Sequence, residues 1–282
     1  MKPIENLKWE KSYNSQVARN IGFITYEEQE NLRKTYIAVL GTGGHGGPLA
    51  EHLARIGCES LLICDNHKFK HSDLNRELCT LKDIGRFKVD ILGNRLKNIN
   101  QNINVKKAYE ITQNNIKSLL KNVKIVALTL NDPVTSILIA RYCRENDIPM
   151  IEAWGVPYLY SLWFTKNSKD FESCYGLYTN HLTMEQIQNS KEVQMHIFDA
   201  FIPKILKFPG LEETVNREKG VINAMVDGKL SLRSFAPMAR ISASYLAFEI
   251  VYAGILKVKP MNLAPKVVGY DYLRMKPIEF EL

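Results

Sequence analysis

The stretch that decides the fold is TYIAVLGTGGHGGPLAEHLARIG, residues 35–57, in which an apolar run, a glycine-rich turn and an amphipathic segment follow one another. This order predicts a strand, a tight turn and a helix. Gly41, Gly43 and Gly46 have the Gly-x-Gly-x-x-Gly spacing that permits the turn, the approach of phosphate to the backbone and close helix packing. The stretch therefore predicts a phosphate-binding turn, and it leaves NAD, FAD and ATP open.

The alternation of strand and helix continues along the first half of the chain. Strand-like runs are expected at 60–64, 104–109, 124–130 and 149–154, and helical patterns at about 83–100, 114–120 and 133–147. Short connections between alternating elements are typical of a parallel sheet with helices on both faces. We expect an α/β fold with a doubly wound, Rossmann-like, mostly parallel sheet.

After residue 154 the regular alternation of strands and helices ends. We expect a strand at 158–166, a loop at 169–180, a polar helix from about Thr183, a long helix near 236–256 and two strands at 266–275 and 277–282. These antiparallel strands would extend the same sheet. The expected organisation is an N-terminal helical segment, 1–34, followed by one domain, 35–282, whose nucleotide-binding part ends near 155 and whose sheet extension and substrate part spans about 156–282.

Composition restricts the compartment and the partners. The 37 basic and 30 acidic residues give a net charge of +7, spread without a dense basic cluster, which argues against nucleic-acid binding. The five cysteines form no Cys-x-x-Cys pair, which favours free thiols in a reducing compartment. Arg240 and Glu249 interrupt the most apolar late segment, so we expect no membrane span and a cytoplasmic protein.

Three side chains after the turn favour ATP. Asp65 ends the second expected strand, where its carboxylate can accept hydrogen bonds from ribose hydroxyls. Arg76 and Lys88 follow within the next 25 residues. A triphosphate that loses pyrophosphate builds negative charge on the leaving group, and cations compensate that charge. Each of the two cations alone is typical of a solvated helix face, but together with the turn they indicate ATP.

The order of these motifs resembles the ubiquitin-activating-enzyme superfamily, whose bacterial members are the MoeB/ThiF-type adenylating enzymes. The shared features are the glycine turn, the strand ending in Asp65, the segments SDLNRE at 72–77 and DIGRFK at 83–88, and the late helix SFAPMARISASYLAFEI. Similarity covers nearly the whole chain from about residue 13. The N-terminal segment resembles one whose arginine, matched by Arg19, reaches across a homodimer into the partner's active site.

The resemblance implies that ATP adenylates the C-terminal carboxylate of a small carrier protein or ribosomal peptide, for transfer to a sulfur or amine nucleophile. It assigns charge compensation to Arg76, Lys88 and Arg19, and Mg²⁺ to an acid after the fourth strand. The residues expected to bind the nucleotide are Gly41, Gly43, Gly44, Gly46, Asp65, Asp73 and Asn131.

Two departures from the family pattern concern charge. Asp73 stands where the family has Asn and adds negative charge near the phosphates; its alternative role is to cap a helix. The family's Mg²⁺-binding Asp aligns with Asn131, and a shift of one residue would let Asp132 bind the metal instead.

Two further departures concern metal and acceptor chemistry. Of the family's zinc-binding Cys-x-x-Cys pairs only Cys174 is present, with Leu177 at its partner position, so we expect no zinc. Cys174 is a candidate acceptor thiol or a bystander. His45 stands in the glycine turn, where it either contacts phosphate or substrate or packs against the next loop.

Two other functions stay open from sequence. A catalytically degenerate nucleotide-binding partner is suggested by Asp73 and Asn131. An NAD- or FAD-dependent oxidoreductase rests on Gly41, Gly43, Gly46 and Asp65 alone, and Arg76 and Lys88 argue against it.

Overall fold

A single mixed β-sheet organises the chain. The computed structural model describes residues 9–154 and 159–282. The sheet in these residues has eight strands in the order β3-β2-β1-β4-β5-β6-β7-β8. The strands are β1 Tyr36–Leu40, β2 Ser60–Cys64, β3 Asn104–Ala108, β4 Ile125–Leu128, β5 Met150–Trp154, β6 Tyr160–Phe164, β7 Lys266–Asp271 and β8 Lys276–Glu281.

The direction of pairing changes once across the sheet. From β3 to β5 all neighbouring strands are parallel, whereas the pairs β5–β6, β6–β7 and β7–β8 are antiparallel. The reversal of strand order falls at β1, which lies between β2 and β4. In such sheets ligands bind beyond the carboxyl ends of the strands at this reversal. The expected fold class, a mostly parallel sheet extended by antiparallel strands, is confirmed.

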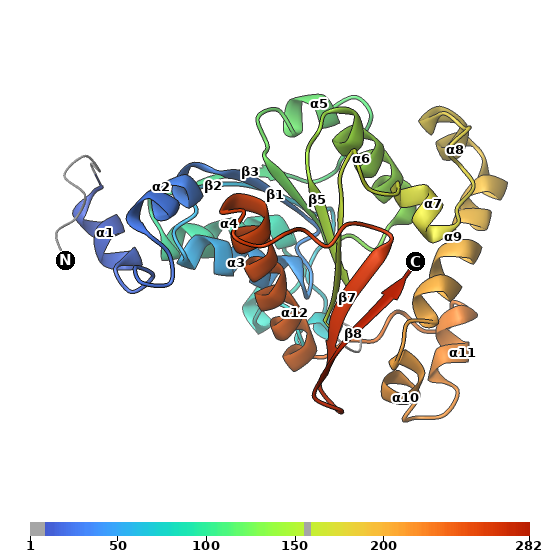
Figure 1. Cartoon of the computed structure of the whole chain (residues 1–282). Helices are drawn as coiled ribbons and strands as arrows, with labels where there is room; N and C mark the ends of the chain where they lie inside the picture. Colours follow the sequence, from blue (N-terminus) through green and yellow to red (C-terminus); the bar gives the residue numbers. More distant parts are fainter. Residues whose placement is uncertain (1–8, 155–158) are drawn as a thin grey trace.

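Helices cover both faces of the sheet. They are α1 Lys11–Val17, α2 Tyr26–Lys34, α3 Gly46–Arg55, α4 Lys88–Ile99, α5 Ile116–Leu119, α6 Pro133–Glu145, α7 Phe171–Tyr175, α8 Met184–Asn189, α9 Lys191–Leu206, α10 Leu211–Val215, α11 Val221–Val226 and α12 Ala236–Phe248, which continues as a π-helical segment, Glu249–Ile255. Figure 1 shows α12 beside α3 on one side of the sheet, and α6, α7 and α9 on the other. None of the described helices is long and apolar enough to cross a membrane.

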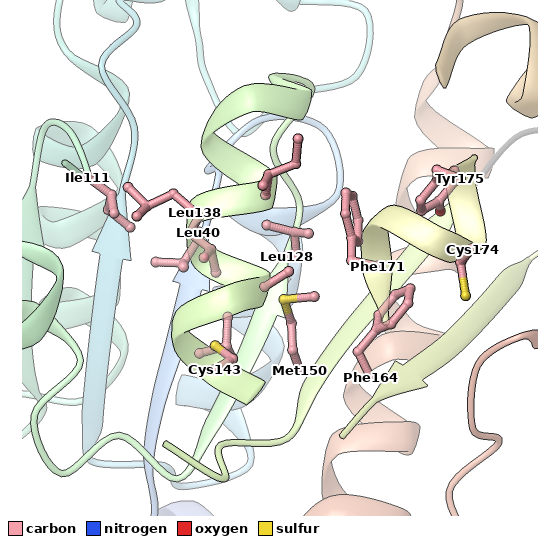
Figure 2. Close-up of a cluster of buried hydrophobic side chains, with 14 of the residues drawn as sticks. Leu40, Ile111, Leu128, Leu138, Cys143, Met150, Phe164, Phe171, Cys174 and Tyr175 are labelled. Atoms are coloured by element: carbon pink, nitrogen blue, oxygen red, sulfur yellow. The ribbon is translucent and has the colours of Figure 1, made fainter. Parts of the chain in front are cut away.

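Alternating strand residues build two separate cores. Ile37 and Val39 of β1 face the core shared with α3, α4 and α12, whereas Ala38 and Leu40 face the core shared with α6, α7 and α9. This is the two-residue period of a strand buried on both faces. Figure 2 shows part of the second core, which extends from Leu40 and Leu128 beside α6 to Phe171 and Cys174 on α7.

Two local expectations were wrong. The helix expected over 83–100 begins only at Lys88, because Gly85 has a positive φ of 82° and the chain turns there. The segment 169–180, expected as a loop, contains α7, whose N-terminus is capped by the Asp170 side chain accepting from the Ser173 N–H at 2.9 Å. The cap and the buried Phe171, Cys174 and Tyr175 explain the helix.

An arginine holds α7 and the following segment in place. Arg141 of α6 donates to both carboxylate oxygens of Glu172 at 2.6 and 2.8 Å. It also donates to the carbonyls of Thr179 at 2.8 Å and Leu182 at 2.7 Å. Leu177, at the position where the resemblance places a zinc-binding cysteine, is fully buried in the same core. An ion pair and apolar packing therefore fix this region.

The turn between β1 and α3 depends on two glycines. Gly41 has a φ of 100°, and a Cβ on it would collide with the Thr129 carbonyl oxygen at the end of β4. A Cβ on Gly46 would collide with the Gly41 carbonyl oxygen and lie 2.6 Å from Thr129 Oγ1. Thr129 Oγ1 itself donates to the Gly41 carbonyl at 2.7 Å. The turn is thus packed between two neighbouring strands and α3.

Gly46→Ala is expected to destabilise the protein by about 1–3 kcal/mol, because backbone atoms that cannot move aside block the added methyl group. Urea denaturation measures this change. Gly44→Ala is the matched control, since the atoms nearest to its Cβ would be Arg76 side-chain carbons at 3.5 Å and the Ala239 Cβ at 3.6 Å, which is ordinary van der Waals contact. Equal stability of the two variants would contradict this description of the turn.

Candidate functional site

A pocket of about 820 Å³ opens at the carboxyl ends of the parallel strands. It lies at the glycine turn and takes side chains from the ends of β2, β3 and β4. The predicted site residues that line it are Gly41, Gly43, Gly44, His45, Asp65, Asp73, Arg76, Lys88, Asn131 and Asp132. Gly46 is buried directly behind the turn. Most of the residues chosen from the sequence are therefore brought together in one place.

Asp65 braces the glycine turn. Its Oδ2 accepts from the Thr42 N–H at 2.8 Å and from Thr42 Oγ1 at 3.2 Å. Its Oδ1 accepts from the His67 N–H at 2.9 Å. The same Oδ1 lies 3.0 Å from Nδ1 of the exposed His67 ring. These contacts use the roughly four acceptor sites of a carboxylate, so a ribose hydroxyl would replace the His67 ring. Asp65 thus has a structural function that the sequence reading did not assign, alongside its expected place beside the nucleotide.

Two cations and two carboxylates form a cluster next to the turn. Lys88 Nζ lies 2.7 Å from Glu77 Oε2 and 3.6 Å from Asp73 Oδ2. Arg76 Nη2 lies 3.4 Å from Glu77 Oε1 and 3.6 Å from Asp73 Oδ1. Asp73, Glu77 and Lys88 are all less than a tenth exposed. Buried charges are stable only when they are paired in this way.

The cluster explains how the protein accommodates an acidic side chain at position 73. The cations at 3.6 Å compensate the charge that Asp73 adds near the phosphate site. Its Oδ2 also accepts from the Lys70 N–H at 2.9 Å, which closes the short helical turn over 71–73. Asp73 therefore caps the turn that contains it rather than a helix that follows.

Glu77 is the site residue that the sequence reading missed. Burial raises the pKa of its carboxyl group, while the adjacent Lys88 ammonium acts in the opposite direction. Glu77 Oε1 would lie 3.3 Å from a Cβ placed on Gly43, so the carboxylate reaches the turn itself. The available signal was its position, directly after Arg76 and four residues after Asp73 in SDLNRE.

The segment after β4 places Asn131 and Asp132 at the pocket, and both residues are exposed. Asp132 is the N-cap of α6: its Oδ1 accepts from the Val134 N–H at 3.1 Å, and its Oδ2 accepts from the Thr135 hydroxyl. No group of three His, Cys, Asp or Glu side chains arranged to hold a metal occurs in the described residues. At this segment the pocket therefore meets one exposed carboxylate, whose two oxygens both accept hydrogen bonds from the start of α6.

His45 precedes the first residue of α3 and lines the pocket. Burial, and secondly the Arg76 guanidinium, lower the pKa of its imidazole to about 4. The ring is therefore neutral at neutral pH, where one nitrogen donates and the other accepts. This protonation state permits a contact with phosphate or substrate without adding charge.

Arg19 is exposed and lies outside the set of described residues that line the pocket. It follows α1, which packs against the C-terminal end of α3: Tyr13 donates to the Gly57 carbonyl at 2.9 Å, and Asn20 donates to the Ile56 carbonyl at 3.1 Å. The pocket lies at the N-terminal end of α3. Arg19 is thus placed at the opposite end of α3 from the pocket of its own chain.

Cys174 is fully buried in α7 beside Phe171 and Tyr175 (Figure 2). Burial raises the pKa of its thiol to about 12, so the group stays protonated at neutral pH. An acceptor thiol requires access and thiolate character, and this position supplies neither. Its burial therefore argues against a role as acceptor.

Comparison with known proteins agrees with the geometry. The ThiF family model matches residues 13–282. A tRNA threonylcarbamoyladenosine dehydratase of Bacillus subtilis is 31% identical over 145 residues, which cover 50% of this chain and 56% of that protein. The yeast tRNA threonylcarbamoyladenosine dehydratase 1 is 27% identical over 51% of this chain and 35% of its own length. The matched regions thus make up about half, or less, of the length of these relatives.

Two solved structures share the fold over almost the whole chain. The structure of PaaA has a TM-score of 0.68 and 19% identity, covering 97% of this chain and 84% of PaaA. Escherichia coli MccB, solved with AMPCPP and MccA, has a TM-score of 0.65 and 18% identity, covering 96% of this chain and 73% of MccB. On the match of the family model, which spans all but the first residues, the chain belongs to the ThiF family.

Proposed function

We propose that this chain is an ATP-dependent adenylyltransferase that activates the C-terminal carboxylate of a peptide or small carrier protein. The observation that carries the proposal is the pocket, in which the glycine turn, Arg76 and Lys88 meet in about 820 Å³. That volume is in the upper part of the range of about 300–1,000 Å³ typical of ligand pockets, so it leaves room for a second reactant beside the nucleotide.

In the proposed reaction a carboxylate oxygen attacks the α-phosphorus of ATP. A new oxygen–phosphorus bond forms, and the bond from the α-phosphorus to the bridging oxygen of the β-phosphate breaks. Pyrophosphate leaves with that electron pair. The backbone N–H groups at the start of α3 face phosphate, and Arg76 and Lys88 compensate the charge that grows on the leaving group. The other product is an acyl-adenylate, ready for a sulfur or amine nucleophile.

The carboxylates of Asp73 and Glu77 hold these cations before ATP arrives. Lys88 Nζ lies 2.7 Å from Glu77 Oε2, and Arg76 Nη2 lies 3.4 Å from Glu77 Oε1. Positioned charges cost no reorganisation at the moment of reaction. The two negative charges also reduce the net positive charge that ATP meets. Two unpaired cations would attract ATP mainly through their net charge. In this chain the paired cations contribute less net charge, so ATP affinity depends more on the glycine turn.

Mg²⁺ is part of the proposal, with Asp132 as its protein ligand and Asn131 as its neighbour. The metal supplies charge neutralisation on the phosphates when it is bound. Asp132→Ala is expected to raise the Mg²⁺ concentration needed for half-maximal activity in the exchange assay described below.

A peptide substrate fits the pocket better than tRNA, although the curated relatives include proteins named as tRNA threonylcarbamoyladenosine dehydratases. Nucleic-acid binding requires clustered cations along a surface. The side of the pocket formed by α9, α10, α11 and residues 231–234 carries Arg233 as the single charge among its described lining residues. MccB, which shares the fold, was solved with the peptide MccA.

The direct test is ATP–pyrophosphate exchange with C-terminal peptides. Arg76→Ala and Lys88→Ala are each expected to lower exchange about 10²–10³-fold, the effect of removing one positioned transition-state donor. Arg95→Ala is the matched control: Arg95 lies on α4 with Lys88, but its partner is Glu51 and it is exposed.

Other outcomes of this assay separate the alternatives. Exchange that requires tRNA instead of a peptide would contradict the proposed substrate class. ATP binding without exchange for any carboxylate would identify a degenerate nucleotide-binding partner. Binding of NAD or FAD in place of ATP would revive the oxidoreductase.

We also propose a homodimer in the cytoplasm, in which Arg19 acts on the partner's pocket. The placement of Arg19 away from its own pocket supports this arrangement, because it reaches a pocket only across an interface. The five cysteines, all free in the structure, are consistent with a reducing compartment.

Mixing Arg19→Ala with Lys88→Ala protein tests the shared site. Each variant alone should be inactive in the exchange assay. If protomers exchange at random, half of the dimers contain one protomer of each variant, and each of these mixed dimers has one intact site out of two. Roughly a quarter of wild-type activity therefore returns. No recovery, despite mixed dimers seen by native mass spectrometry, would contradict an Arg19 contribution in trans.

A further inference from the structure

One side of the nucleotide pocket is apolar. It is formed by α9, α10, α11 and the segment 231–234, and the opposite side carries the glycine turn and the charged cluster. We call its apolar side chains the apolar wall, and Arg233 is the single charged residue beside them; the wall contains Phe198, Leu206, Leu211, Val215, Met225 and Leu232. The charged cluster suits the phosphates of ATP. The end of β2 that carries Asp65, the expected ribose contact, is paired with the end of β3, which Tyr109 and Ile111 follow at the pocket. The adenine ring is expected there, so the apolar wall is left for another occupant.

The apolar wall leaves hydrophobic surface in contact with solvent. On α9, Ile197 and Phe201 are buried in the core, but Phe198 between them remains 42% exposed and lines the pocket. Leu232 is 38% exposed. Because transfer of apolar surface out of water is favourable, a ligand that covers these side chains gains affinity.

A hydrogen bond joins the apolar wall to the catalytic side of the pocket. Asn75 donates from Nδ2 to the Ser234 carbonyl at 2.9 Å, and Arg76 donates from Nη1 to Asn75 Oδ1 at 2.9 Å. The Asn75 side chain therefore links Ser234, at the end of the segment that forms the wall, to Arg76, the cation proposed to contact the phosphates. The 231–234 end of the wall thus borders the charged side of the pocket.

The chemistry requires the terminal residue of the substrate to enter this pocket. Its carboxylate must touch the α-phosphorus, and its side chain branches from the adjacent Cα. We propose that the apolar wall receives this side chain, and that the substrate ends in a large apolar residue. This inference rests on the proposed adenylation and specifies its substrate: a peptide ending in residues such as Leu or Phe, instead of a flexible Gly-Gly tail.

The wall discriminates in two ways. A glycine terminus covers none of the exposed apolar surface, whereas a Leu or Phe side chain buries against it. That burial corresponds to roughly ten- to hundredfold in affinity. A Glu terminus covers less of this apolar surface and depends for a partner on Arg233, the single charge among the described lining residues on this side. We therefore expect Leu and Phe termini to bind more tightly than Gly and Glu termini.

Acyl-sulfamoyl adenosines test the preference without depending on the rest of the peptide. In these stable analogues a sulfamoyl group replaces the phosphate of the acyl-adenylate. N-acetyl-leucyl, N-acetyl-phenylalanyl, N-acetyl-glycyl and N-acetyl-glutamyl analogues are titrated calorimetrically into the full chain. The leucyl and phenylalanyl analogues should bind roughly ten- to hundredfold more tightly than the glycyl one.

A matched pair of variants assigns the preference to the wall. Phe198→Lys places a second cation beside Arg233 and should lower the leucyl-to-glutamyl affinity ratio at least about tenfold, because it removes apolar area and gives a glutamyl carboxylate a further partner. Met195→Lys introduces the same charge one helical turn earlier on α9. Met195 is 65% exposed and lies outside the described pocket lining, so the ratio should stay as in wild type.

The outcomes separate this inference from the proposed function. If no analogue binds, adenylation itself is wrong. If the glycyl or glutamyl analogue binds as tightly as the leucyl one, adenylation stands and the apolar terminal residue is wrong. An equal change of the ratio in Met195→Lys and Phe198→Lys would also contradict the assignment to the wall.

Discussion

The close approach of the β1–α3 turn to the end of β4 is the constraint on which the site depends. Glycine is required at 41 and 46, since a Cβ at either position would collide with a backbone carbonyl oxygen. The resulting contact holds the N-terminus of α3 at the point where the strand order reverses. Asp65 and Thr42 brace the turn from the β2 side. The predicted phosphate site is thus formed mainly by backbone, in a position set by packing.

Charge pairing is the second determinant of the site. Two carboxylates, Asp73 and Glu77, stand against Arg76 and Lys88 in a buried cluster next to this turn. The arrangement holds the cations in place and keeps their charges compensated when no nucleotide is present. It accommodates an acidic residue at position 73 without loss of the cation pair, so this departure from the family pattern does not by itself argue for a degenerate site.

The sequence predicted the sheet and most of the pocket because strand periodicity and the glycine spacing are local signals. It predicted less well those features that depend on contacts between segments far apart in the sequence. The α7 helix depends on the Asp170 cap and on packing of Phe171, which apolar spacing over 169–180 did not indicate. Glu77 was missed because its partner, Lys88, is eleven residues away and meets it only in the fold. The apolar wall combines three separate helices, so no single segment predicts it.

The central claim is that a substrate carboxylate attacks the α-phosphorus of ATP in this pocket. Oxygen-18 in the terminal carboxylate of a Leu-ending peptide tests it most directly. When a nucleophile such as hydroxylamine cleaves the acyl-adenylate at its carbonyl carbon, one carboxylate oxygen stays with the nucleotide. Mass spectrometry should therefore find AMP that carries one oxygen-18 atom. Unlabelled AMP, or formation of ADP and phosphate instead, would contradict the account.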